Sequence, residues 1–141
     1  KKKIVEKDEK EKKFRKILNF GHTFGHAYEA SLKYSKKLNH GEAVILGMSS
    51  ALKFSFQNHK LDKKHFQKIK NHLKKAKLPN NLNYFFGKKD VNKIVSFMTK
   101  DKKNTSDKIN LILLKKIGSA NIKNQFSQNY IRLFLKKELS N

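Results

Sequence analysis

His22 and His26, four residues apart, have a spacing that suits metal chemistry. Residues at i and i+4 share one face of a helix, so two imidazoles can approach one metal ion. The pair is not an HExxH motif, because Thr23 stands where the glutamate would be. A third imidazole, His40, precedes Gly41 at a predicted turn and can return towards the pair. Catalytic zinc usually keeps three protein ligands and one open position. Three histidines of this chain, or two with a carboxylate from elsewhere, fit such a site.

The pattern from Phe14 to Leu32 predicts one long helix with its polar residues on one side. At about 100° per residue, the polar positions share an arc of roughly 80°. The residues of this polar arc are Glu11, Arg15, Asn19, His22, His26 and Glu29. Together these groups can bind an anion, ligate a metal and transfer protons.

Gly21 and Gly25 are unusual inside a predicted helix, where each glycine costs about 1 kcal/mol relative to alanine. They are expected where another backbone or a ligand approaches closely, and the sequence does not decide between these alternatives. The remaining histidines lie among lysines, and we interpret them as solvated surface residues: His59, His65 and His72.

The rest of the hydrophobic pattern predicts a mainly helical single domain over residues 1–141 with one small β-hairpin. Asn39 is expected to cap a central buried helix, with Glu42 in its first turn. An amphipathic helix over 61–76 is expected to be capped by Asp62, and another helix follows Asp90. The last predicted elements are a strand at 109–114, a turn at Gly118 and a helix over 127–139.

The formal charge of +23 suits a polyanion or an anionic substrate. However, only Arg15 and Arg132 are arginine, the residue that binds phosphates and bases bidentately. Lysine is spread over nearly every segment together with abundant asparagine, which indicates a compositional bias. A basic nucleic-acid-binding module is therefore the less favoured alternative from another functional class.

The composition also limits the compartment and the ligand types. The sequence contains no cysteine, so disulfides and thiolate metal ligands are excluded. It shows no apolar run of membrane-spanning length and no signal-peptide pattern. A soluble cytoplasmic protein without membrane contact is expected.

Two blocks of the sequence closely resemble the signature of 3-dehydroquinate synthase. Arg15 to Glu29 matches R-x-x-L-N-x-G-H-T-x-G-H-A-x-E, and His40 to Met48 matches H-G-E-A-V-x-x-G-M. Weaker matches include Lys1 with residues 8–11 upstream, and Met98 with Asp101-Lys102-Lys103 downstream. The resemblance extends from residue 1 to about residue 120.

This resemblance implies an enzyme of the shikimate pathway of aromatic amino acid biosynthesis. The family is a carbon–oxygen lyase that uses NAD and a divalent metal, Zn²⁺ or Co²⁺. It converts the anionic substrate 3-deoxy-D-arabino-heptulosonate 7-phosphate into 3-dehydroquinate with loss of phosphate. Another sugar phosphate cyclase, or a metal-dependent polyol dehydrogenase of the same superfamily, is the nearest alternative.

The resemblance also implies roles for individual residues. His22 and His40 are expected to be metal ligands, with a third ligand, a glutamate, from a segment preceding this chain; Glu42 is then a helix-entry acid. His26 is expected to transfer a proton near the substrate phosphate, paired with Glu11 through solvent. The residues expected to bind the substrate are Lys1, Arg15, Asn19 and Lys102, the last favoured over Lys103.

The family's Rossmann-like, NAD-binding N-terminal domain has no counterpart here, because no G-x-G-x-x-G motif or strand–helix alternation occurs. No cofactor-binding residue is therefore expected in this chain. The chain starts at Lys1, which together with the resemblance predicts a C-terminal part of a longer protein. We expect it to be inactive without the N-terminal domain, and a homodimer is a further expectation from the family.

Overall fold

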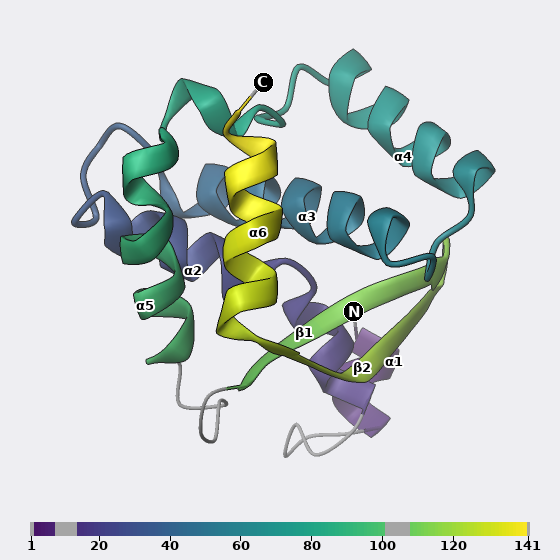
Figure 1. Cartoon of the computed structure of the whole chain (residues 1–141). Coiled ribbons are helices and arrows are strands. Elements are labelled where there is room, and N and C mark those ends of the chain that lie inside the picture. Colours follow the sequence, from purple (N-terminus) through teal and green to yellow (C-terminus); the bar gives the residue numbers. More distant parts are fainter. Residues whose placement is uncertain (1, 8–13, 101–107, 141) are drawn as a thin grey trace.

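The computed structural model describes residues 2–7, 14–100 and 108–140 (Figure 1). Its helices are α1 (Lys2–Lys7), η1 (Phe14–Asn19), α2 (His22–Ser31), α3 (His40–Gln57), α4 (Lys63–Lys75), η2 (Leu82–Tyr84), η3 (Lys88–Asp90), α5 (Val91–Thr99) and α6 (Gln128–Glu138); η denotes a 3₁₀ helix. The strands are β1 (Lys108–Lys116) and β2 (Ser119–Ser127). The predicted fold class, mainly helical with one hairpin, is confirmed. Among the described residues, no helix is long and apolar enough to cross a membrane.

Helix α3 runs through the middle of the molecule, with α2, α4, α6 and the hairpin arranged around it (Figure 1). It begins as the sequence predicts: the Asn39 backbone N–H donates to Glu42 Oε2 at 2.9 Å, which stabilises the first turn. Small and apolar side chains then allow neighbours to pack closely on several sides of the helix. Its buried residues are Ala43, Leu46, Gly47, Ser49, Ser50, Ala51, Leu52, Phe54 and Ser55.

The two strands form an antiparallel hairpin in which β1 turns its apolar side chains inwards. Ile109, Leu111 and Leu113 alternate with less buried residues, as expected for a strand with one covered face. Gly118 has φ +82° and forms the turn, which confirms the predicted hairpin. The Leu114 N–H donates to Ser55 Oγ at 3.0 Å, so the hairpin is tied to α3.

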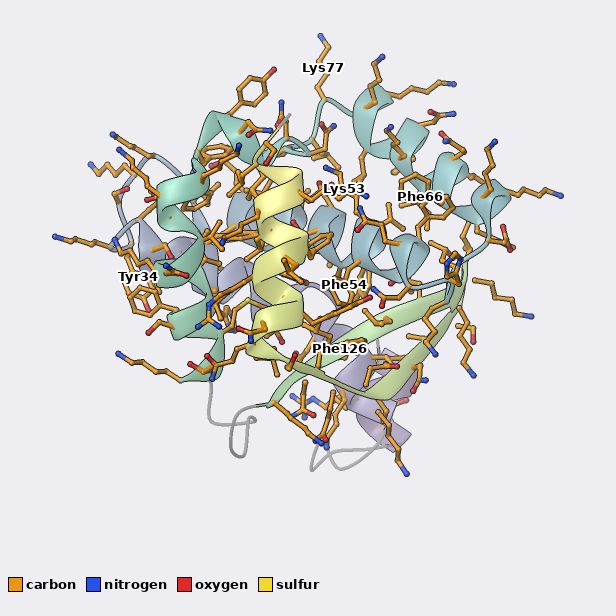
Figure 2. All side chains as sticks on the ribbon, in the orientation of Figure 1. Tyr34, Lys53, Phe54, Phe66, Lys77 and Phe126 are labelled. Atoms are coloured by element: carbon orange, nitrogen blue, oxygen red, sulfur yellow. The ribbon has the colours of Figure 1, made fainter. Side chains whose placement is uncertain are left out.

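The main core is rich in aromatic side chains from elements far apart in the sequence. Phe54 of α3 packs edge-on against Phe126 of β2 and Phe134 of α6, with ring centroids 4.8 and 4.9 Å apart. Figure 2 shows Phe54 and Phe126 in the region under α6, whereas Lys77 projects outwards. The closing helix is therefore held by side-chain interdigitation with α3 and the hairpin.

Helix α4 has a smaller hydrophobic cluster of its own. Its buried side chain, Phe66, packs with Leu52 and Leu61 in a group separate from the main core. Asp62 caps its start, because its side chain accepts the His65 backbone N–H at 2.8 Å. The rest of α4 is strongly basic and largely exposed.

The prediction of one helix from Phe14 to Leu32 is wrong. The chain forms the 3₁₀ helix η1, turns at Phe20 and Gly21, and only then enters α2. Gly21 has φ +81°, a left-handed conformation that no α-helix contains. Arg15 and Asn19 therefore do not share a helix face with His22, His26 and Glu29. Tertiary packing at Gly21 outweighs the helical periodicity.

Candidate active site

The candidate site lies where α2 and α3 pack so closely that their backbones are in contact. A Cβ on Gly21 would lie 2.4 Å from the backbone nitrogen of Met48, and one on Gly25 would lie 2.8 Å from the carbonyl oxygen of Ala43. Gly47 is the reciprocal position, since its Cβ would meet Gly21 and Gly25. Contacts this short leave no room for a side chain. Gly21 and Gly25 were expected where another backbone or a ligand approaches closely. The structure shows the first of these, since the backbone of α3 lies against both glycines.

This packing brings together the three histidines that the sequence singled out. His22 is the first residue of α2, His26 lies one turn later, and His40 is the first residue of α3. The rings of His22 and His26 are edge-on, with centroids 5.4 Å apart. The rings of His26 and His40 are stacked, with centroids 6.1 Å apart and an interplanar angle of 24°. The ring of His26 thus neighbours the rings of both predicted metal ligands, His22 and His40.

Glu29 joins this group, although no individual role was predicted for it beyond its place on the polar arc. Its Oε2 lies 3.0 Å from His40 Nδ1, which links the second half of α2 to the start of α3. The Glu29 side chain is only 16% exposed, compared with 63% for His40. The position of Glu29 on the polar arc could have indicated this contact, because His22, His26 and Glu29 all belong to α2.

The donors present fit a metal ion whose coordination is completed from elsewhere. Neutral imidazoles suit zinc and related metals, and a ligating histidine usually donates its other ring N–H to a carboxylate, as His40 can to Glu29. Among residues 2–7, 14–100 and 108–140, no three His, Cys, Asp or Glu side chains are placed to hold a metal. The arrangement therefore does not favour a site made of three histidines of this chain. A metal site made of two histidines of this chain and a carboxylate from elsewhere stays the prediction.

The predicted substrate-binding residues are only partly in view. Arg15 and Asn19 are half-buried in η1, which packs against both strands of the hairpin. Asn19 is separated from His22 only by the turn at Phe20 and Gly21. The other two predicted substrate-binding residues, Lys1 and Lys102, lie outside the described parts of the chain, as does Glu11, the predicted partner of His26 in proton transfer. All these assignments stay predictions.

The other histidines are on the surface, as predicted. His59 and His72 are exposed, and His65 is half-buried beside Asp62 at 2.6 Å. Hydrogen bonds from the backbone N–H and the ring of His65 hold the pKa of the Asp62 carboxyl below its ordinary value. This pair stabilises the start of α4.

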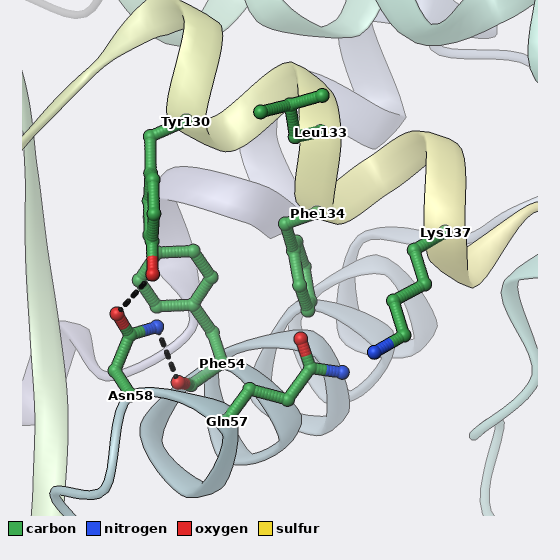
Figure 3. Close-up of a pocket in the computed structure, with 7 residues that line it drawn as sticks. All are labelled: Phe54, Gln57, Asn58, Tyr130, Leu133, Phe134 and Lys137. Carbon is green, nitrogen blue, oxygen red and sulfur yellow. Dashed lines mark hydrogen bonds between the residues drawn. The ribbon is translucent and has the colours of Figure 1, made fainter.

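Two further pockets lie away from the histidines. One of about 310 Å³ lies between α3 and α4 and is lined by residues that include Leu52, Phe66 and Lys70. The other, of about 180 Å³, lies between the end of α3 and α6 (Figure 3). There Tyr130 donates to Asn58 Oδ1 at 2.8 Å beside Phe54. Neither pocket is lined by a predicted site residue.

Comparison with known sequences tests the resemblance directly. The family model described as "3-dehydroquinate synthase C-terminal" matches residues 1–104. The chain is 60% identical over 140 residues to the 3-dehydroquinate synthase of Pelagibacter ubique (strain HTCC1062), covering 99% of this chain and 38% of that protein. It is 37% identical to that of Bradyrhizobium diazoefficiens, covering 97% of this chain and 37% of that protein. The chain thus spans well under half the length of these relatives.

Solved structures show the same architecture. A 2-deoxy-scyllo-inosose synthase complexed with carbaglucose-6-phosphate, NAD⁺ and Co²⁺ superimposes with a TM-score of 0.69 at 25% identity, covering 90% of this chain and 35% of that one. The 2-epi-5-epi-valiolone synthase of Streptomyces hygroscopicus subsp. jinggangensis 5008, with NAD⁺ and Zn²⁺ bound, gives a TM-score of 0.76 at 19% identity, covering 96% and 36%; this likeness concerns the fold alone. With the family model matching most of its length, the chain belongs to the 3-dehydroquinate synthase C-terminal family.

Proposed function

We propose that this chain is the metal- and substrate-binding part of a 3-dehydroquinate synthase, a carbon–oxygen lyase of the shikimate pathway. The observation that carries the proposal is the convergence of His22, His26 and His40 at the α2–α3 crossing. These histidines come from two separate motifs of the family, and helix packing brings them into one group. The relatives named 3-dehydroquinate synthase align over nearly the whole chain.

In this proposal His22 and His40 hold the divalent metal, together with a glutamate from another part of the protein. A bound metal, Zn²⁺ or Co²⁺, would supply Lewis-acid polarisation of the substrate hydroxyl whose carbon is oxidised. The imidazoles bind in their neutral form, and Glu29 is placed to keep one of them oriented. Metal affinity then depends on both histidines.

His26 is the proposed proton-transfer group, because its ring neighbours the rings of both proposed ligands and its side chain is exposed to an approaching substrate. An imidazole can accept and return a proton near neutral pH, as phosphate elimination requires. Glu11 is proposed to pair with it through solvent. Cationic and amide groups neutralise and orient the substrate's carboxylate, phosphate and hydroxyls: Lys1, Arg15, Asn19 and Lys102.

The rest of the reaction is assigned to the remainder of the protein. NAD is proposed to bind mainly to an N-terminal domain of the same protein, so this chain alone has no synthase activity. The relatives are consistent with this division, since the chain covers 38% of the Pelagibacter ubique protein. A homodimer in the cytoplasm completes the proposal.

The experiment that tests the function is a phosphate-release assay on the full-length protein with NAD, a divalent metal and the seven-carbon substrate. We expect release, and we expect His22→Ala to lower it by more than about 100-fold because a metal ligand is lost. His72→Ala is the matched control, since His72 is exposed on α4, and it should keep normal activity. Absence of release from the unaltered protein would exclude this synthase activity.

A second candidate is a cyclase acting on another sugar phosphate. The solved synthase that binds carbaglucose-6-phosphate has this fold, but it is 25% identical, compared with 60% for the Pelagibacter ubique relative. Assaying hexose phosphates beside the seven-carbon substrate separates the two. The polyol dehydrogenase alternative predicts net reduction of NAD without phosphate release. The nucleic-acid alternative predicts salt-sensitive binding that survives His22→Ala.

A further inference from the structure

We propose that Glu29 is a positioning residue that fixes the tautomer and ring orientation of His40, so that His40 presents Nε2 to the metal. This rests on the proposed function, because it concerns the same metal site. The contact that carries it joins Glu29 Oε2 and His40 Nδ1 over 3.0 Å. The two residues lie on different helices, so the contact depends on the tertiary fold.

The chemistry of the two groups determines which nitrogen is available. An ionised carboxylate only accepts hydrogen bonds, so a bond to Glu29 requires the proton on His40 Nδ1. In a neutral imidazole the lone pair is then on Nε2, and a metal binds the nitrogen without a proton. The Glu29–His40 contact therefore selects one of the two neutral tautomers before any metal arrives.

The surroundings make Glu29 the fixed partner of the pair. Its side chain is 16% exposed and belongs to α2, which packs at backbone contact on α3 through Gly25 and Gly47. The His40 side chain is 63% exposed, at the first residue of α3, where few neighbours would restrain it. The half-buried carboxylate thus restrains a ring that is otherwise largely in solvent.

A second contact from α2 restrains the plane of the same ring. His26 stacks on His40 at 6.1 Å between centroids, and Glu29 follows His26 by less than one helical turn. The two contacts act in different directions, since one is in the plane of the imidazole and the other on its face. The ring orientation of His40 as well as its tautomer is then set by contacts from α2.

Glu42 provides a matched control on the same helix turn as His40. Its carboxylate accepts the Asn39 backbone N–H at 2.9 Å and thereby caps α3. Glu42→Gln and Glu29→Gln each remove one negative charge near His40 and keep an acceptor oxygen. A role that is only electrostatic predicts that Glu29→Gln weakens zinc binding as much as Glu29→Ala and that Glu42→Gln also weakens it. A positioning role predicts that Glu29→Gln keeps most of the zinc affinity and that Glu42→Gln changes it little.

The test uses the full-length protein and two readouts that need no substrate. Zinc affinity is measured by competition with a chelator, and the His40 tautomer is measured by ¹⁵N NMR of the metal-free protein, assigned with His40→Gln. Glu29→Ala should weaken zinc binding about 10–100-fold and mix the two tautomers. Glu29→Gln should recover much of both, and Glu42→Gln should leave the tautomer unchanged.

The proposal is overturned if metal-free wild-type His40 carries its proton mainly on Nε2, a result that does not depend on any Glu29 variant folding. It is also overturned if Glu29→Ala binds zinc as tightly as wild type, or if Glu42→Gln weakens zinc as much as Glu29→Ala. Its failure is distinguishable from failure of the proposed function. A protein with Glu29-dependent zinc binding but no phosphate release would retain this inference and reject the synthase activity.

Discussion

Gly47 of α3 touches the backbone of Gly21 at the start of α2: a Cβ at position 47 would lie 2.3 Å from the Gly21 carbonyl oxygen. This contact sets the separation of the two helices whose first residues are His22 and His40. The positions of the two proposed ligands therefore depend on a residue without a functional group.

Gly47→Ala is expected to destabilise the protein by about 2 kcal/mol, because overpacking outweighs the roughly 1 kcal/mol gain in helix propensity. The opposing atoms belong to the backbone, so no side-chain rotation relieves the contact. Urea denaturation measures the loss. Gly87→Ala is the control, since nothing lies within 4 Å of its Cβ. A Gly47→Ala protein as stable as wild type would contradict this interpretation.

Lys53 and Glu138 form an ion pair that joins α3 to the last turn of α6 at 2.5 Å, and Gln57 also donates to Glu138 at 3.3 Å. The side chain of Lys53 is 31% exposed and that of Glu138 is 12% exposed. Lys53→Met should cost about 1–3 kcal/mol, because the shielded carboxylate loses its charged partner. A double-mutant cycle with Glu138→Gln measures the coupling. Purely additive effects of the two substitutions would show that the pair contributes nothing.

Tyr28 makes stability depend on pH in the alkaline range. Burial raises the pKa of its hydroxyl far above the ordinary 10.0, and it donates to Ser50 Oγ at 2.8 Å. The unfolded chain therefore loses this proton first. The contribution of Tyr28 is complete below pH 10.0 and decreases above it by about 1.4 kcal/mol per pH unit. Unfolding free energies of wild type and Tyr28→Phe should converge as pH rises above 10.0. A constant difference would refute this.

The lowered pKa of Asp62 leads us to expect that stability falls as the pH decreases in the acid range. Because hydrogen bonds from His65 lower its pKa below 3.8, its contribution to stability is present above that pH and lost as pH falls through the folded value. A carboxyl ¹³C titration should give a midpoint under 3.8. Asp62→Ala should lower the unfolding temperature at about pH 6 and have little effect at about pH 2. An equal effect at both would mean that the ionised form is not the one that caps α4.

The sequence predicted those elements whose signals are local. Asn39 and Glu42 marked the start of α3, and the apolar run at 109–114 marked β1, because caps and short β-branched runs act within a few residues. The break at Gly21 was missed. Helical periodicity continues through it, and its left-handed conformation accompanies close packing on the backbone of Met48, which is distant in the sequence.

The sequence indicated the proposed ligands of the candidate site but not the contacts that would support them. Motif resemblance indicated His22 and His40, since the family pattern names them directly. The Glu29–His40 contact requires knowing how α2 crosses α3, and no single-helix spacing contains that information. Residues that act through another residue are harder to find from sequence than residues that touch the ligand.

We expect the separate cluster under α4 to open independently of the main core. Phe66, Leu52 and Leu61 hold this helix, whereas α2, α3 and α6 share the main aromatic core. Amide protons of α4 should therefore exchange with solvent through a local opening that leaves the main core folded. Those of α3 around Leu46 and Gly47 should exchange only when the whole domain unfolds. On this expectation the basic helix α4 opens and closes while the histidine cluster stays assembled.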